Sequence, residues 1–306
     1  MARMASRQTI VLIALVTQAL SADPGRAGLR YAQPTAAPAG RITVLYDAFG
    51  RPSELERDWG FAALVEYGGK RVLFDTGNDA GIFERNVTRL GVDLTRLDAA
   101  VISHRHGDHT TGLDYLLQRN QEVKIYAPQE GAFFKSAVLR GFLAHHPGLP
   151  PELRYDEPPP GRTSGTPWPR ANFQVVTGTT EILPGFFVLT TQSRKPGTME
   201  MNEVSLAIRT PRGLAVVVGC SHPGVETILK QAAGIDPRLY TVTGGFHLVM
   251  MPRAEVDRVA AVLRDQLKVQ RVAPGHCTSE QGFAVFLERF TDRFDRAGLG
   301  ATLELP

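Results

Sequence analysis

His104-Arg105-His106-Gly107-Asp108-His109 places three imidazoles and one carboxylate within a single hexapeptide. It continues the run Ala99-Ala100-Val101-Ile102-Ser103, which has the composition of a buried strand. Crowding so many ionisable side chains at one point is costly unless a cation holds them together. Imidazole nitrogen and carboxylate oxygen are ligands that zinc and related divalent ions take. The hexapeptide therefore predicts a metal site at the end of a strand.

The spacing within the hexapeptide divides its ligands into two pairs. His104 and His106 are two residues apart, so they can face one centre from an extended turn. Asp108 and His109 are offset from them and could serve a second centre nearby. The alternative is a polar surface turn with incidental histidines. Because three of only eight histidines fall here beside an aspartate, the sequence favours the metal interpretation.

Other histidines also follow apolar, strand-like runs, in the turns Gly219-Cys220-Ser221-His222, Gly244-Gly245-Phe246-His247 and Pro274-Gly275-His276. Strand ends that meet at one rim are where layered folds place functional groups. We therefore expect His222 and His276 to be metal ligands, and His247 and Cys220 to be possible metal or substrate contacts. Taken singly, each histidine could equally be a hydrogen-bonded core residue. The pair His145-His146 is expected to face solvent.

Strand and helix patterns alternate along the chain. Strand composition occurs at 42–46, 61–67, 71–75, 97–103, 122–127, 186–190, 204–209, 214–218, 239–243 and 269–273, and helical spacing at 82–90, 112–118, 225–233, 256–267 and 283–290. This order predicts a single domain over 41–306 of the α/β (α+β) class, an αββα sandwich. Residues 131–178 break the pattern and are rich in Pro and Gly, which predicts an inserted lid or binding loop or, alternatively, a passive surface excursion.

The first residues have the composition of an export signal. Arg3 and Arg7 form a basic region, and the apolar run Ile10–Leu20 is too short for a stable membrane anchor. Small residues offer cleavage points as far as Ala32, so we expect residues 1–32 to contain the signal and residues 33–40 to form a linker. The protein is then periplasmic or secreted. The alternative is tethering to the membrane by an uncleaved leader.

Charge and cysteine content exclude some classes of protein. Residues 1–40 account for the whole formal charge of +3, so the net charge is no argument for a nucleic-acid surface and no nucleic-acid partner is expected. The only cysteines are Cys220 and Cys277, which excludes a disulfide framework. They could form one structural disulfide in an oxidising compartment. Their neighbouring histidines indicate instead that one or both lie close to the metal.

Further motifs extend the comparison to a known family, the metallo-β-lactamase superfamily. The chain resembles in particular the branch labelled 7,8-dihydropterin-6-methyl-4-(β-D-ribofuranosyl)-aminobenzene-5′-phosphate synthase-like. The motifs that carry this resemblance, over about residues 41–290, are Ile42–Asp47, Trp59-Gly60-Phe61, Leu73-Phe74-Asp75-Thr76-Gly77, the hexapeptide, Gly219–Gly224, Gly244–Leu248 and Pro274–Thr278. The resemblance implies the αββα fold, with one or two divalent ions at the rim between the two sheets.

By position, the resemblance makes His104 and His106 ligands of a first metal. Asp108 and His109 match ligands of a second metal, which His276 closes. Asp75 then lies behind the ligands and orients a histidine or the loop.

The chain departs from the common family pattern at two positions. The stretch Leu189–Glu203 lacks a ligand histidine that many members have, and Cys220 replaces a bridging aspartate. We infer that His222 fills the vacant ligand position, with His247 as its competitor. A thiolate at Cys220 would favour zinc over harder ions.

These features predict a metal-dependent hydrolase acting on a small-molecule substrate. Metal-bound hydroxide, available because the ion lowers the pKa of water towards ~7, would attack an ester, phosphoester, lactone or amide. Asp108 is the expected catalytic residue, holding the nucleophile as well as ligating. The alternatives are a pterin-related synthase, against which export counts, and a non-catalytic ligand-binding or metal-binding module. A dioxygen-reducing di-iron enzyme is disfavoured, because that branch of the superfamily typically has Glu where this chain has His106.

Overall fold

The computed structural model describes residues 40–130, 133, 168–195, 198 and 200–306. One compact unit spans Ala37–Pro306. The predicted export signal, nearly all of the predicted linker, most of the predicted insertion and the pair His145-His146 lie outside the described residues. Among the described helices, none has the length and apolar character needed to cross a bilayer.

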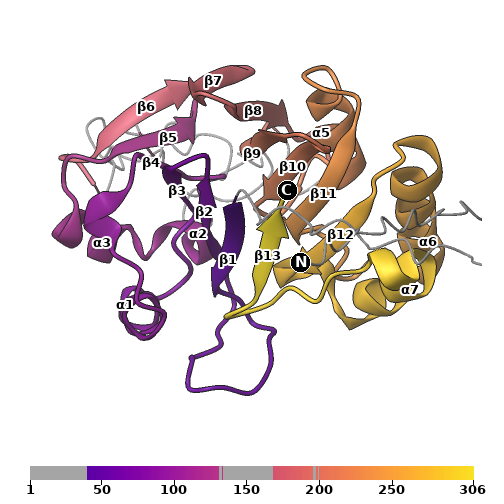
Figure 1. Ribbon diagram of the computed structural model, residues 1–306, viewed down its shortest axis with the longest axis horizontal. Helices are drawn as coiled ribbons and strands as arrows, with labels where there is room; N and C mark the ends of the chain where they lie inside the picture. The colour runs from indigo at the N-terminus through magenta and orange to yellow at the C-terminus, as the bar shows by residue number, and fades with distance from the viewer. Residues whose placement is uncertain (1–39, 131–132, 134–167, 196–197, 199) are drawn as a thin grey trace, which may run out of the picture. The chain divides into compact units, whose positions relative to one another are not determined.

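Two mixed sheets form the centre of this unit (Figure 1). The first has the order β13-β1-β2-β3-β4-β5-β6, with bounds β1 Gly40–Tyr46, β2 Ala62–Tyr67, β3 Lys70–Phe74, β4 Ala99–Val101, β5 Lys124–Pro128, β6 Asn172–Val176 and β13 Thr302–Leu305. The second has the order β12-β11-β10-β9-β8-β7, with bounds β7 Thr180–Leu183, β8 Phe186–Gln192, β9 Asn202–Thr210, β10 Gly213–Val218, β11 Leu239–Gly245 and β12 Arg271–Gly275.

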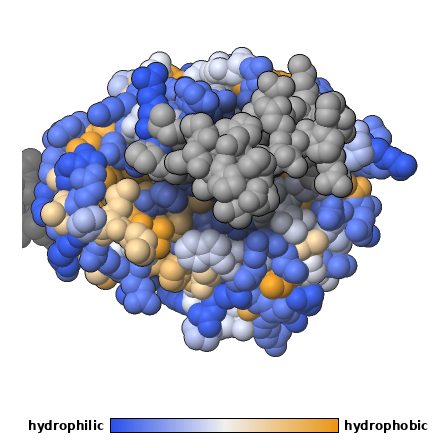
Figure 2. All heavy atoms as spheres, turned by 180° about the vertical axis from the view of Figure 1, so that it is seen from behind, coloured by the Kyte–Doolittle hydropathy of each residue, from blue (hydrophilic) through white to orange (hydrophobic). Residues whose placement is uncertain are grey.

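Helices cover the outer face of each sheet. Their bounds are α1 Ala80–Arg89, α2 Gly107–Thr110, α3 Leu113–Arg119, α5 Val225–Ala232, α6 Arg253–Ala261 and α7 Glu280–Phe290. One apolar cluster joins the first sheet to α1 and α3, and another joins the second sheet to α5, α6 and α7. A third fills the space between the sheets, where Phe74 and Leu206 are fully buried. These layers confirm the predicted αββα sandwich. The face of the molecule in Figure 2 is mostly hydrophilic, with apolar residues in small groups.

Individual residues explain where β2 turns into β3 and where helix α1 begins. Gly68 and Gly69 both have positive φ, at 56° and 76°, and join β2 to β3 with Tyr67 opposite Lys70. Two consecutive residues with positive φ match the right-handed twist of a hairpin, which is why glycine is favoured at both. At the start of α1 the Asp79 carboxylate accepts a 2.8 Å hydrogen bond from the N–H of Ile82, an N-cap.

Parallel pairing brings the histidine-bearing turns to one rim. In the first sheet, β3, β4 and β5 pair in parallel, and in the second β10, β11 and β12 do so. The carboxyl ends of parallel strands lie at the same edge of a sheet. The turns after β3, β4, β10, β11 and β12 therefore converge between the two sheets.

Three strands were not predicted. β6 lies inside the stretch 131–178 that was expected to be irregular, so the insertion ends before residue 172. β7 and β13 have four residues each and their side chains are largely exposed or half-buried, so they give little apolar periodicity. β7 and β13 lie at sheet edges, where pairing with a neighbour sets the conformation more than the side chains do.

Candidate metal centre

Seven potential metal ligands gather at this rim in two sets. We define the first ligand set as His104, His106 and His222, and the second as Asp108, His109, Cys220 and His276. Within each set the donor atoms all lie within 4.8 Å of one another. Cys220 and His222 also form a group with His247, so the two sets adjoin. Every residue that the sequence proposed as a ligand is thus brought to one place.

The second ligand set has the spacing of a tetrahedral site. His109 Nε2, Cys220 Sγ and His276 Nε2 lie 3.2 Å from one another. Asp108 Oδ2 lies 3.4 Å from His276 Nε2 and 3.7 Å from His109 Nε2. An ion with ligand distances of about 2.0 to 2.3 Å separates its tetrahedral ligands by roughly 3.3 to 3.8 Å. The donors therefore surround a space of the right size for such an ion.

The first ligand set is a triangle of imidazoles. His104 Nε2 lies 3.1 Å from His106 Nδ1, and the His222 ring centroid lies 4.7 Å from that of His104 and 4.9 Å from that of His106. The ring of His247 stands behind, 4.4 Å from that of His222. His222 therefore occupies the position that the sequence left open between these two histidines, with His247 as its neighbour.

Asp75 fixes the proton positions on two ligand histidines. Its carboxylate accepts 2.7 Å hydrogen bonds from Ser103 N, Ser103 Oγ and His109 Nδ1. Because the Ser103 hydroxyl gives its only proton to Asp75, its oxygen accepts from His104 Nδ1 at 2.8 Å. Both imidazoles therefore carry their proton on Nδ1, and each turns the lone pair of Nε2 toward the other ligands.

Glu203 holds the turn after β10 through hydrogen bonds to its backbone and to the His222 ring. The fully buried carboxylate accepts from the backbone N–H groups of Cys220, Ser221 and His222 at 2.7 to 3.1 Å. It also accepts from His222 Nδ1 at 2.9 Å, so the neutral tautomer of this ring has its lone pair on Nε2. These bonds hold Ser221 at a φ of 62°, a conformation that costs a non-glycine residue free energy.

Asp47 supports the turn after β12. Its buried carboxylate accepts from the backbone N–H of His276 at 3.1 Å and from Phe49 N at 3.1 Å. Burial raises the pKa of Asp47 to about 6, despite these hydrogen bonds. His276 itself has a φ of 46°, so its turn is held in a strained conformation.

Two of the candidate ligand histidines, His104 and His106, are kept neutral. Burial, together with the neighbouring imidazoles, holds the pKa of His104 well below its usual range and lowers that of His106 to about 4. Burial also raises the pKa of the Cys220 thiol, with Cys277 adding to the effect. His109 differs: burial opposes its protonation, but Asp75 and Asp108 raise its pKa to about 9. A cation bound at His109 Nε2 would supply in place of that proton the positive charge that Asp75 and Asp108 favour.

The convergence of unprotonated donors fits a divalent cation. At least three imidazole lone pairs, a carboxylate and a thiol face one another, and uncompensated acceptors in a buried site are unfavourable. A cation bound in each ligand set would satisfy the donors of that set, and a cation beside Cys220 would favour ionisation of its thiol.

Comparison with known proteins agrees with this geometry. The sequence pattern of the Metallo-beta-lactamase superfamily matches residues 60–276. The chain belongs to the metallo-β-lactamase superfamily. This confirms the resemblance noted from the sequence, and members of the superfamily normally bind divalent metals at such a rim.

Three known proteins are similar to this chain over most of its length. The 7,8-dihydropterin-6-methyl-4-(β-D-ribofuranosyl)-aminobenzene-5′-phosphate synthase of Methanocaldococcus jannaschii is 28% identical over 288 residues, covering 85% of this chain and 93% of that protein. The solved structure of Tm1679, described as a metal-dependent hydrolase of the β-lactamase superfamily, has a TM-score of 0.66 and 27% identity, covering 87% and 99%. The short form of human tRNase Z, at TM-score 0.51, 14% identity and coverage of 87% and 99%, shares the fold alone.

Sequence reasoning missed three supporting residues, Glu203, Asp47 and Ser103. Asp47 and Ser103 end apolar runs, and Glu203 starts one, so an acid or hydroxyl beside a buried strand was the available signal. The alternative of a disulfide is not realised, because Cys220 and Cys277 are both free and buried.

Proposed function

We propose that this chain is a metal-dependent hydrolase that acts on a small ester, phosphoester, lactone or amide. The observation that carries the proposal is the pair of adjoining ligand sets. A purely structural metal site has one closed set of ligands, whereas catalytic sites keep a position open for substrate. The first ligand set offers only three protein donors, which leaves such a position.

The chain's own residues suit this chemistry. Divalent ions, with zinc favoured by the thiol and imidazole donors, would activate water and stabilise negative charge on the substrate oxygen. Asp108 is the ligand of the second set that reaches the surface, with 19% of its side chain exposed while those of His109 and His276 are fully buried. We propose that the Asp108 carboxylate orients the attacking water as well as ligating.

Two aromatic side chains are suited to contact the substrate. The ring of Trp59 lies 4.9 Å from that of His276, and 44% of Trp59 is exposed, so it presents a flat apolar surface beside the second ligand set. His247 is half-buried, and its Nδ1 has no hydrogen-bond partner among the described residues. Because that nitrogen is itself buried, we propose that the exposed part of the His247 ring makes the substrate contact.

A second candidate function is a pterin-related synthase. It is favoured by the similarity to the M. jannaschii synthase, which extends over 93% of that protein. The product in that protein's name joins a dihydropterin to an aminobenzene that carries a ribosyl phosphate. Formation of this product from its pterin and aminobenzene halves would support the synthase.

The hydrolase proposal is tested by metal analysis combined with a substrate panel. Purified protein is expected to contain one or two divalent ions and to cleave at least one of a phosphodiester, a lactone, an ester and a β-lactam. His106→Ala should lose metal and turnover, whereas Gln118→Ala, an exposed position on α3, should keep both. A folded protein that binds no divalent ion would refute an enzyme of either kind. Metal-loaded protein that hydrolyses nothing but forms the pterin product would select the synthase.

A further inference from the structure

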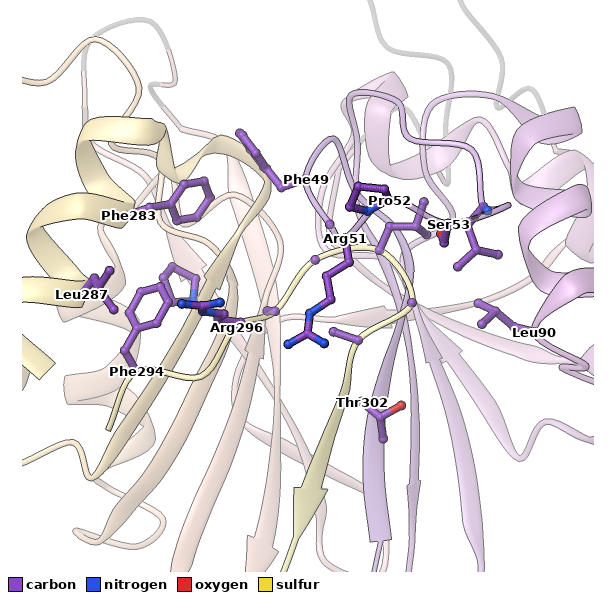
Figure 3. A pocket seen from close by; sticks show the side chains of 18 of the residues that line it. Phe49, Arg51, Pro52, Ser53, Leu90, Phe283, Leu287, Phe294, Arg296 and Thr302 are labelled. Atoms are coloured by element: carbon purple, nitrogen blue, oxygen red, sulfur yellow. Dashed lines mark hydrogen bonds between the residues drawn. The ribbon is translucent and has the colours of Figure 1, made fainter. Parts of the chain in front are cut away.

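A cleft of about 860 Å³ lies between the loop that follows β1 and helix α7 (Figure 3). None of the residues of the two ligand sets lines it. Its volume falls in the range of roughly 300 to 1,000 Å³ that small-molecule sites occupy. The cleft is therefore a candidate binding site separate from the metal centre.

Apolar side chains form its walls. Phe49 and Phe283 meet edge to face, with ring centroids 4.7 Å apart. Phe294 and Leu287 continue this wall along the α7 side, and Leu90 faces them from the opposite side (Figure 3). Leu287 is 47% exposed. Binding of a ligand that removes such apolar surface from water is favoured in free energy.

Two arginine side chains give the cleft positive charge that no acidic lining residue balances. Arg51 and Arg296 both line the cleft, and no Asp or Glu does. Within the described part of the chain neither guanidinium has an ion-pair partner. On the neighbouring helix α7, by contrast, Arg289 pairs with Asp257 at 2.9 Å. Two unpaired guanidinium groups beside apolar walls favour an occupant that carries an anionic group, which they can bind through several N–H donors.

The cleft is formed in advance of any ligand. The loop after β1 and the segment before β13 are joined by a 2.7 Å hydrogen bond from Leu299 N to Phe49 O. Gly50 and Gly298 have φ angles of 149° and 121°, and a Cβ on Gly298 would lie 2.9 Å from the Gly50 Cα. Because only glycine permits this approach, the two arginine-bearing segments are fixed relative to each other. A preformed site loses less conformational entropy on binding.

We propose that this cleft binds a small amphiphilic anion. A carboxylate or phosphate group would bind to Arg51 and Arg296, and an apolar chain or ring would pack against Phe49, Phe283 and Leu287. The proposal concerns a site distinct from the ligand sets, so it does not depend on which reaction the metal centre performs.

Isothermal titration of the full chain with decanoate, decyl phosphate and decanol tests this proposal. The two anions distinguish a carboxylate from a phosphate ligand, and decanol has the same chain without charge. The test variant is Arg51→Gln/Arg296→Gln. Its charge-matched control is Arg96→Gln/Arg119→Gln, two exposed positions outside the cleft. Leu287→Ser tests the apolar wall, and because Leu287 is exposed the substitution should leave the fold intact.

At least one anion should bind, and its affinity should fall about tenfold or more in the double test variant while the control keeps it. Leu287→Ser should weaken binding several-fold. Three results would overturn the proposal: no anion binding at millimolar concentration, equal binding of decanol, or full affinity in the double test variant. Binding that is lost in His106→Ala instead would place the anion at the metal centre and would also overturn it.

Discussion

Replacing Asp75 by asparagine is expected to weaken metal binding while the chain stays folded. The carboxylate accepts from Ser103 N on one oxygen and from Ser103 Oγ and His109 Nδ1 on the other. Asparagine keeps the shape and one accepting oxygen, but it turns an N–H₂ group toward Ser103 Oγ and His109. His109 can then bond only by accepting on Nδ1, which moves its proton to Nε2. The lone pair that faces the second ligand set is lost.

The size of the effect follows from this change of tautomer. Loss of a carboxylate behind a ligand histidine typically reduces metal affinity about 10- to 100-fold, or roughly 1.4 to 2.7 kcal/mol. Asp75 serves His109 directly and His104 through Ser103, so we expect the upper part of this range. The unfolding free energy of the metal-free chain should fall by about 1 to 3 kcal/mol, because buried hydrogen bonds are lost.

Competition with a chromophoric chelator measures the affinity, and urea unfolding of the metal-free protein measures the stability. Asp98→Asn is the matched control. Its carboxylate accepts from Arg71 N at 2.9 Å and Lys70 Nζ at 3.0 Å, at the amino end of β4 and so away from the ligands. Unchanged metal affinity in Asp75→Asn would refute the reasoning. Equal losses in both variants would show a general effect of stability instead.

Three further outcomes are expected. Glu203→Gln should lower the unfolding free energy, measured in urea, by about 1 to 3 kcal/mol, because one of the two oxygens that accept from the 220–222 turn becomes a donor. Its control, Glu200→Gln at an exposed position, should have no effect. Gly112→Ala should be destabilised in the same assay by about 1 to 3 kcal/mol, since its Cβ would lie 2.1 Å from Thr76 O, and Gly178→Ala, with open space around it, should match the wild type. Chelation should lower the melting temperature in calorimetry by about 5 to 10 °C if the ion is present at 100 times its dissociation constant, and an unchanged melting temperature after verified metal removal would contradict tight binding by the ligand sets.

The strands made of long apolar runs could be predicted from the sequence. The apolar runs that became β10 and β11 are buried at every position, so composition alone marked them as strands. β6, β7 and β13 could not be found in the same way. Their residues alternate little and are largely half-buried or exposed, and their conformation depends on backbone bonds to a neighbouring strand.

The candidate ligands were predictable and their supports were not. Histidines that end apolar runs are visible in the sequence because so few other positions carry them. Glu203 gave no such signal, since a glutamate at the start of a strand is ordinary until the 220–222 turn is seen folded over it. The hydrogen bond from His276 N to the Asp47 carboxylate joins residues that are far apart in the sequence, and no local pattern encodes it.

The distribution of the donors over both sheets has a consequence for the order of folding. His104 and His106 follow β4 in the first sheet, and their partner His222 follows β10 in the second. The second set is divided in the same way, since Cys220 and His276 come from the second sheet. A growing chain that has completed only the strands up to β6 therefore offers isolated pairs of donors, which hold a divalent ion weakly. We therefore expect tight binding of a divalent ion to follow the docking of the two sheets.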